Sequence, residues 1–155
     1  MKLILLKCVT DMVKETIELE SEEDTRSLAR SLTSLLAPGH VLLLSGDLGA
    51  GKTTLTRYLC QELGIDQGQV ASPTFTVIHE YHGGRIPVAH VDLYRLGPGA
   101  DVMDLGLYEY LERGFLVIME WAEFMTEALE YPTVKVHLKL LPDGTRLAQL
   151  EISSS

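Results

Sequence analysis

Two uninterrupted apolar runs stand out against the amphipathic remainder of the chain. Val41–Leu44 and Phe115–Met119 contain no polar residue, which is typical of strands buried on both faces. Before the first run, Ser21–Asp24 forms a capping-box pattern that predicts a helix start, and Pro38-Gly39 marks its end. A second helix is predicted to run from about Lys52 to Gly64. The apolar face of the first helix is expected to consist of Leu28, Leu32, Leu35 and Leu36.

Two further pairs of predicted strands flank turns that are rich in glycine and proline. The pairs are Thr76–Tyr81 with Ile86–Val91, and Val134–Leu140 with Arg146–Ile152. In the first hairpin, Gly83 and Gly84 supply the positive φ that a tight turn requires. A strand at Thr16–Leu19 and a helix near Asp101–Glu112 complete the predicted elements.

Buried runs without alternation, bounded by helices, predict an α/β fold. We expect a three-layer sandwich whose mixed sheet has a parallel centre and antiparallel additions. The 155 residues, 46% of them hydrophobic, suit a single domain with a buried core.

The charge balance narrows the range of partners. Thirteen basic and 22 acidic residues give a net charge of -9, which argues against a protein that binds nucleic acid unaided, since that requires clustered lysine and arginine. Cys8 and Cys60 have neither metal-site nor disulfide-framework spacing, so both are interpreted as reduced thiols. Apolar runs are too short for a signal-peptide core or a membrane span. We therefore expect a cytoplasmic protein with no membrane contact.

The stretch GDLGAGKT, Gly46–Thr53, satisfies the phosphate-loop pattern GxxxxGK[ST] between a predicted strand and a predicted helix. Its backbone amides and the helix dipole can bind a triphosphate, Lys52 can reach the β- and γ-phosphates, and the Thr53 hydroxyl can ligate magnesium. The fold is therefore expected to be P-loop NTPase-like. The predicted nucleotide-binding residues are Gly49, Ala50, Gly51, Lys52, Thr53 and Thr54.

Hydrolysis also requires carboxylates near the metal and the γ-phosphate. Asp92 follows the run Val88–Val91, and Glu120 follows Phe115–Met119, so each is expected at the carboxyl end of a buried strand, where open α/β sheets bind ligands. Together with Lys52 they are the predicted catalytic residues. Glu120 either ligates the metal directly, or acts as a base while Asp92 holds the metal.

Other polar segments carry weaker signals. The hydroxyls of Ser72–Phe75 can reach a γ-phosphate if that loop closes over the nucleotide, and Trp121 is interpreted mainly as a packing residue. Four histidines lack the mutual spacing of a zinc site and are interpreted as hairpin, strand or solvent residues. They are His79, His82, His90 and His137.

From about Ile17 to Ile152 the chain resembles the bacterial TsaE family, also called YjeE, the tRNA threonylcarbamoyladenosine biosynthesis ATPases. The resemblance rests on five motifs in order: GDLGAGKTT, SPTFTVIHEY, HVDLYRL, LGLYEYL and the pair Glu120-Trp121. The first dozen residues extend beyond the usual family start, so residues 1–12 are expected to be an extension or disordered.

The resemblance implies a cytoplasmic, magnesium-dependent ATPase that works with the TsaB and TsaD proteins. Those partners attach threonylcarbamoyl to the adenosine beside the anticodon of tRNAs that read codons beginning with A, so this chain would meet tRNA only indirectly. By the same resemblance, the phosphate loop with Lys52 binds ATP, Thr53 and Glu120 ligate magnesium, and Asp92 lies beside the metal.

Three other classes of function share the phosphate loop with an accessory ATPase. A small-molecule kinase should bring an arginine-rich lid, and no such cluster is visible in the sequence. A regulatory GTPase needs an Asn-Lys-x-Asp guanine reader, but the chain contains no asparagine. A nucleotide-dependent binding module that hydrolyses little remains indistinguishable from a slow ATPase by sequence.

Overall fold

A computed structural model describes residues 1–9, 12–71, 77–125 and 129–153 of the chain. Within these ranges the chain forms one mixed sheet, with strand order β1-β2-β8-β7-β3-β6-β5-β4. The strands are β1 (Lys2–Val9), β2 (Met12–Leu19), β3 (Val41–Ser45), β4 (Ile78–Tyr81), β5 (Val88–Asp92), β6 (Leu116–Glu120), β7 (Thr133–Leu140) and β8 (Arg146–Ser153). The contiguous strands β7, β3, β6 and β5 are parallel, and β4, β8, β2 and β1 add to them antiparallel.

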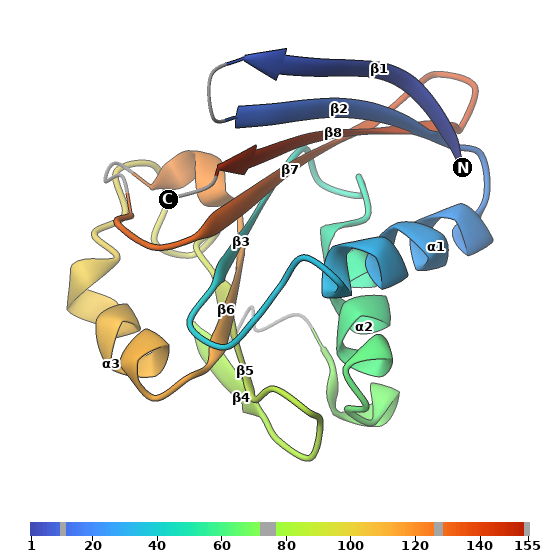
Figure 1. The fold of residues 1–155 in the computed structure, drawn as a ribbon. Helices are drawn as coiled ribbons and strands as arrows, with labels where there is room; N and C mark the ends of the chain where they lie inside the picture. Colours follow the sequence, from blue (N-terminus) through green and yellow to red (C-terminus); the bar gives the residue numbers. More distant parts are fainter. Residues whose placement is uncertain (10–11, 72–76, 126–128, 154–155) are drawn as a thin grey trace.

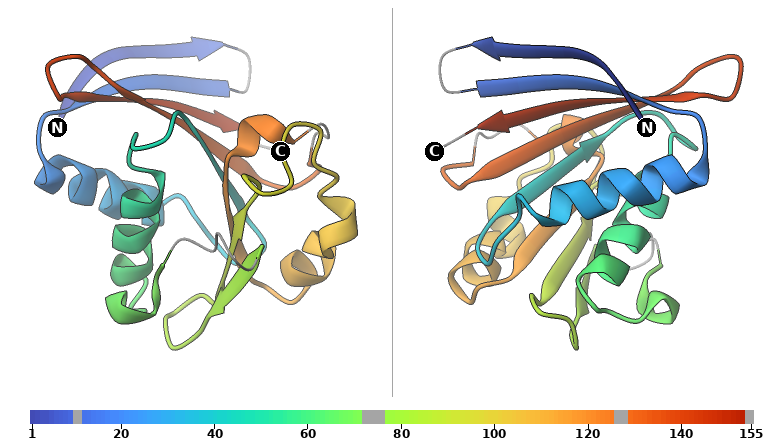
Figure 2. Two further views of the ribbon diagram at one scale, coloured as in Figure 1. Left: turned by 180° about the vertical axis from the view of Figure 1, so that it is seen from behind. Right: turned by 45° about the vertical axis from the view of Figure 1, so that its right-hand side comes forward.

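Helices cover both faces of the sheet (Figure 1). The helices are α1 (Glu22–Thr33), α2 (Lys52–Glu62) and α3 (Leu107–Glu112), with the short 3-10 helices η1 (Gln67–Gln69), η2 (Met103–Leu105) and η3 (Ala122–Phe124). Figure 2 shows α1 and α2 on one face and α3 on the other. Side chains alternate along β3, so that Leu42 and Leu44 join the core beneath α1 and α2 while Val41 and Leu43 join the core on the α3 side. The predicted α/β sandwich with a parallel centre is confirmed.

The capping box predicted at the start of α1 is present. The Ser21 hydroxyl accepts from the Asp24 amide at 3.2 Å, and the Asp24 carboxylate accepts from the Ser21 amide at 3.1 Å. The helix ends earlier than the apolar pattern predicted: its last residue is Thr33, and Ser34 is its C-cap. Leu35 therefore lies outside the helix and is 44% exposed, although Leu28 and Leu32 are buried as expected.

Two segments of the structure differ from the predicted elements. No strand is predicted before Thr16, whereas residues 2–9 form β1, an edge strand that pairs antiparallel with β2. The helix expected near Asp101–Glu112 is divided into η2 and α3 at Gly106, whose φ of 71° breaks the helical path. Both predicted hairpins are present, as β4-β5 and β7-β8. None of the helices in the described ranges has the length and apolar character that crossing a bilayer requires.

Candidate functional site

The loop between β3 and α2 is shaped by three glycines in the left-handed region, Gly46, Gly49 and Gly51, with φ values of 133°, 79° and 110°. A Cβ at Gly46 would lie 2.2 Å from the Leu138 carbonyl oxygen, so the loop can approach β7 only with glycine there. Helix α2 begins at Lys52 with Gly51 as its N-cap, and among the described residues no side chain caps it. Its first amides are therefore available to an anion.

Lys52 is buried at the base of this loop, with 5% of its surface exposed. Its ammonium donates to the carbonyl oxygens of Gly46 and of Asp47, the latter at 3.0 Å, and lies 4.0 Å from the centre of the Trp121 ring. Burial lowers the pKa of Lys52, and the carboxylates of Glu123 and Glu120, followed by those of Asp92 and Asp47, oppose that shift. The loop thus holds a positive charge among acidic groups.

Asp92 and Glu120 end the neighbouring parallel strands β5 and β6 and are paired in register. Both are buried, at 3% and 2% exposure. Because β5 and β6 are parallel, their carboxyl ends bring the two side chains to the same edge of the sheet. The Glu120 Oε2 atom accepts a hydrogen bond from the Thr53 hydroxyl at 3.0 Å. Asp92 Oδ1 accepts from the Tyr94 amide at 2.9 Å.

The separation between the Thr53 and Glu120 oxygens suits two neighbouring ligands of an octahedral cation. Two such oxygens, each about 2.1 Å from Mg²⁺, are about 3.0 Å apart. In the described part of the chain, no three His, Cys, Asp or Glu side chains gather into a metal-binding group. A cation held here would thus draw its other ligands from phosphate and water, as Mg²⁺ commonly does.

These side chains line one open cavity of about 430 Å³. Its wall includes Lys52, Thr53, Asp92, Glu120 and Trp121. Trp121 has a left-handed φ of 58°, which is uncommon for a bulky residue. This backbone turn brings its ring over Lys52 and within 4.9 Å of the Tyr94 ring, centre to centre.

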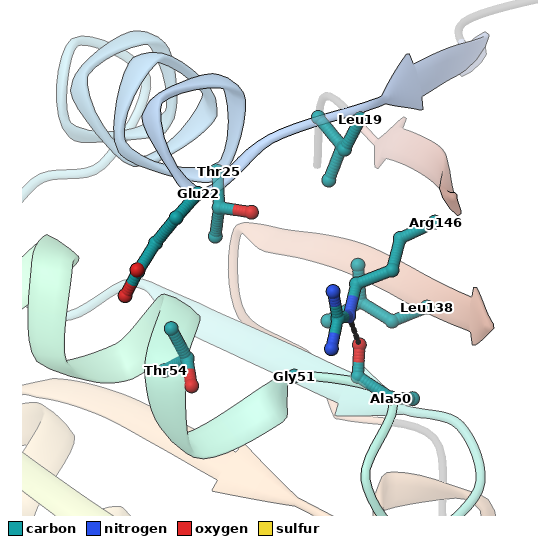
Figure 3. A pocket seen from close by; sticks show the side chains of 8 residues that line it. All are labelled: Leu19, Glu22, Thr25, Ala50, Gly51, Thr54, Leu138 and Arg146. Carbon is teal, nitrogen blue, oxygen red and sulfur yellow. Dashed lines mark hydrogen bonds between the residues drawn. The ribbon is translucent and has the colours of Figure 1, made fainter. Parts of the chain in front are cut away.

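A second cavity of about 270 Å³ adjoins the first beyond the α2 N-terminus (Figure 3). Gly51, Thr54 and Arg146 line both cavities. Figure 3 shows Arg146 reaching from β8 toward the loop, where its Nε donates to the Ala50 carbonyl oxygen at 3.0 Å. Leu19 and Leu138 supply apolar wall. The two cavities are therefore neighbours, with Gly51 and Thr54 between them.

The sequence profile of the family described as threonylcarbamoyl adenosine biosynthesis protein TsaE matches residues 19–148. The chain belongs to this family. It is 47% identical to the protein TsaE of Nostoc sp. over 141 residues, which cover 86% of this chain and 83% of that protein. It is 40% identical to the Bacillus subtilis protein TsaE over 124 residues, covering 80% of this chain and 77% of that protein.

A solved structure agrees with this family membership. The crystal structure of Bacillus subtilis YdiB matches with a TM-score of 0.70 at 28% identity, covering 97% of this chain and 88% of that chain. The resemblance to the TsaE family drawn from the sequence motifs is thus confirmed.

The predicted site residues of this TsaE family member converge on the two cavities. Lys52, Thr53, Asp92 and Glu120 line the larger cavity with Gly49, and Ala50 lines the smaller one. Trp121 packs against Phe124, as predicted, but also forms part of the cavity wall. The predicted loop Ser72–Phe75 lies outside the described residues.

Two residues at the site were missed by the sequence analysis. The sequence predicts Arg146 only as the start of a strand, and nothing in its local pattern shows that β8 begins beside the phosphate loop. His90 was interpreted as an ordinary strand residue, yet it is fully buried and contacts Glu120. Its spacing of two from Asp92 was the available signal, because strand residues two apart face the same side.

Proposed function

We propose that this TsaE family member is a cytoplasmic protein that binds ATP with magnesium, hydrolyses it slowly, and serves threonylcarbamoyladenosine formation in tRNA together with the TsaB and TsaD proteins. The observation that carries the proposal is the 3.0 Å contact between the Thr53 and Glu120 oxygens beside the buried Lys52, directly after a glycine loop. The pathway follows from family membership.

The side chains divide the proposed chemistry between them. Loop amides and the α2 N-terminus bind the phosphates, and Lys52 donates to the β- and γ-phosphate oxygens. Thr53 and Glu120 would hold Mg²⁺, which would neutralise the charge that develops on the phosphates. Asp92 accepts a hydrogen bond from the attacking water and orients it toward the γ-phosphorus. The reaction is a transfer of the γ-phosphoryl group to water.

The second cavity is assigned to the base and ribose in this proposal. Leu19 and Leu138 offer apolar surface, while Glu22 and Thr25 at the start of α1 provide polar groups. Glu22 also accepts a hydrogen bond from the Tyr58 hydroxyl, which ties its carboxylate to α2. The chain contains no asparagine and therefore lacks the Asn-Lys-x-Asp guanine reader, which supports adenine over guanine.

The decisive experiment measures phosphate release from ATP by the purified chain, alone and with TsaB and TsaD, with and without Mg²⁺. We expect slow release alone, faster release with both partners, and none from Glu120→Gln. Rapid, kinase-like hydrolysis by the chain alone would contradict the accessory role. ATP binding without phosphate release, even with both partners, would instead favour a nucleotide-dependent binding module.

The proposed route to tRNA is indirect. With a net charge of -9 the chain lacks the excess of basic residues that tRNA binding requires, so contact is expected only through the partner assembly. Binding of bare tRNA with a steep salt dependence would overturn this part of the proposal.

A further inference from the structure

A line of buried hydrogen bonds extends from Glu120 away from the phosphate loop. His90, on β5, has no exposed surface, and its Nε2 lies 2.8 Å from Glu120 Oε1. On the other side of the ring, His90 Nδ1 lies 3.1 Å from the Tyr81 hydroxyl. Tyr81 is 3% exposed and donates to the Ala71 carbonyl oxygen at 3.1 Å. The line therefore connects the segment that follows η1 with the strands β4, β5 and β6.

The direction of these hydrogen bonds follows from the donors available. A tyrosine hydroxyl donates once, and a carbonyl oxygen only accepts. The Tyr81 hydroxyl donates to the Ala71 carbonyl oxygen and also lies within hydrogen-bond distance of His90 Nδ1. A carboxylate oxygen only accepts, so His90 Nε2 donates to Glu120 Oε1 at 2.8 Å. The imidazole is thus fixed at both nitrogens.

This arrangement leaves the two oxygens of Glu120 in different surroundings. Oε1 is engaged by His90, and Oε2 is engaged by the Thr53 hydroxyl. A carboxylate without the first contact can rotate about its last bond, or present both oxygens to one cation. With His90 in place, Oε2 is the oxygen that contacts Thr53, while Oε1 is held by the imidazole.

We propose that His90 and Tyr81 are positioning residues that make Glu120 a single-oxygen ligand for the cation beside Thr53. This inference rests on the proposed function, because it concerns how that function's metal ligand is held. Single-oxygen ligation suits the strict octahedral shell of Mg²⁺, whereas Ca²⁺ accepts two-oxygen carboxylates and more ligands. The pair therefore sets both the affinity for Mg²⁺ and its preference over Ca²⁺.

The test measures, by calorimetry, the affinity for a non-hydrolysable ATP analogue at increasing concentrations of MgCl₂ and, in a separate series, of CaCl₂. His90→Phe removes both contacts and should raise the half-saturating Mg²⁺ concentration about tenfold or more. Tyr81→Phe removes one neutral contact and should raise it about fivefold or less. His90→Gln retains a donor toward Glu120 and should recover much of the loss. The preference for Mg²⁺ over Ca²⁺ should fall in His90→Phe.

Two controls separate positioning from a general structural effect. Binding of the analogue in EDTA should change less than about twofold in a folded His90→Phe protein, and His82→Gln, on the exposed hairpin, should leave the Mg²⁺ dependence unchanged. In a Glu120→Gln background, adding His90→Phe should cause no further shift, since His90 acts through Glu120.

Each failure has a distinct meaning. If wild-type protein binds the analogue without any effect of Mg²⁺, the proposed function fails. If wild-type protein responds to Mg²⁺ but folded His90→Phe and Tyr81→Phe respond identically to it, the positioning role alone is wrong. A further loss in the Glu120→Gln background, or an equal loss in EDTA, would also overturn that role.

Discussion

Replacing the phosphate-loop lysine tests the proposed nucleotide site most directly. Lys52→Ala should weaken ATP binding while leaving the fold intact. The ammonium is expected to donate to β- and γ-phosphate oxygens, and these contacts vanish in the variant. Removal of the Lys52 side chain opens space at the cavity wall for water, which can donate to the Gly46 and Asp47 carbonyl oxygens in its place.

The expected loss of ATP affinity follows from the contacts that Lys52 gains with the phosphates and those that it gives up in the loop. Two hydrogen bonds between charged groups contribute about 2 to 3 kcal/mol each. To reach the phosphates, Lys52 must give up its present contacts with two carbonyl oxygens and the Trp121 ring. The loss of these contacts cancels about 2 kcal/mol of the binding free energy gained. The net loss is about 3 kcal/mol, which corresponds to about a 150-fold weaker affinity.

Calorimetry with Mg·ATP measures this loss, and thermal unfolding checks that the variant is folded. Lys14→Ala is the matched control: it removes the same charge from an exposed lysine on β2 that pairs with Glu151. Its affinity for ATP should change less than about twofold, because an exposed distant charge is screened by salt. Unchanged ATP affinity in folded Lys52→Ala, or an equal loss in Lys14→Ala, would refute the reasoning.

Three further outcomes are expected. Glu120→Gln should raise the Mg²⁺ requirement at least tenfold in a titration of nucleotide binding, while Asp92→Asn should slow phosphate release with nucleotide still bound; a Mg²⁺ shift in Asp92→Asn alone would reverse the two roles. Competition binding should favour ATP over GTP, because the chain lacks the Asn-Lys-x-Asp guanine reader; tighter GTP binding by wild type would contradict the choice of adenine. Burial raises the pKa of the Cys60 thiol to about 12. In a Cys8→Ser protein at pH 8, Cys60 should therefore react with a thiol reagent about a thousandfold more slowly than an exposed thiol, until denaturant unfolds the chain. Rapid reaction in the native protein would show that Cys60 is accessible.

Local patterns predicted most of the sheet and the phosphate loop because their signals are contained in short stretches. The runs Val41–Leu44 and Phe115–Met119 correspond closely to β3 and β6, since a strand buried on both faces strongly favours apolar residues. The phosphate-loop pattern predicts its own backbone shape, because its glycines adopt the positive φ values that the loop requires. Asp92 and Glu120 were found because parallel strands end at one edge.

Features that depend on distant parts of the chain were not predictable in the same way. Arg146 reaches the phosphate loop only because β8 pairs with β7, whose Leu138 carbonyl lies against Gly46. The contact between His90 and Glu120 joins residues 30 positions apart on neighbouring strands. The early end of α1 was missed because leucines beyond Ser34 continue the apolar pattern without continuing the helix.

The charges around the phosphate loop explain why the proposed ligand is ATP with its metal rather than ATP alone. Lys52 lies among the carboxylates of Glu120 and Asp92, and Glu123 accepts from the Gly46 amide at 3.3 Å, so acidic groups surround the loop. Arg146 adds one positive charge beside Ala50. A bare triphosphate would meet repulsion from these carboxylates in a cavity that water only partly screens. A divalent cation shared by Glu120 and the phosphates converts that repulsion into attraction, which is why the affinity for nucleotide is expected to depend steeply on Mg²⁺ in this acidic protein.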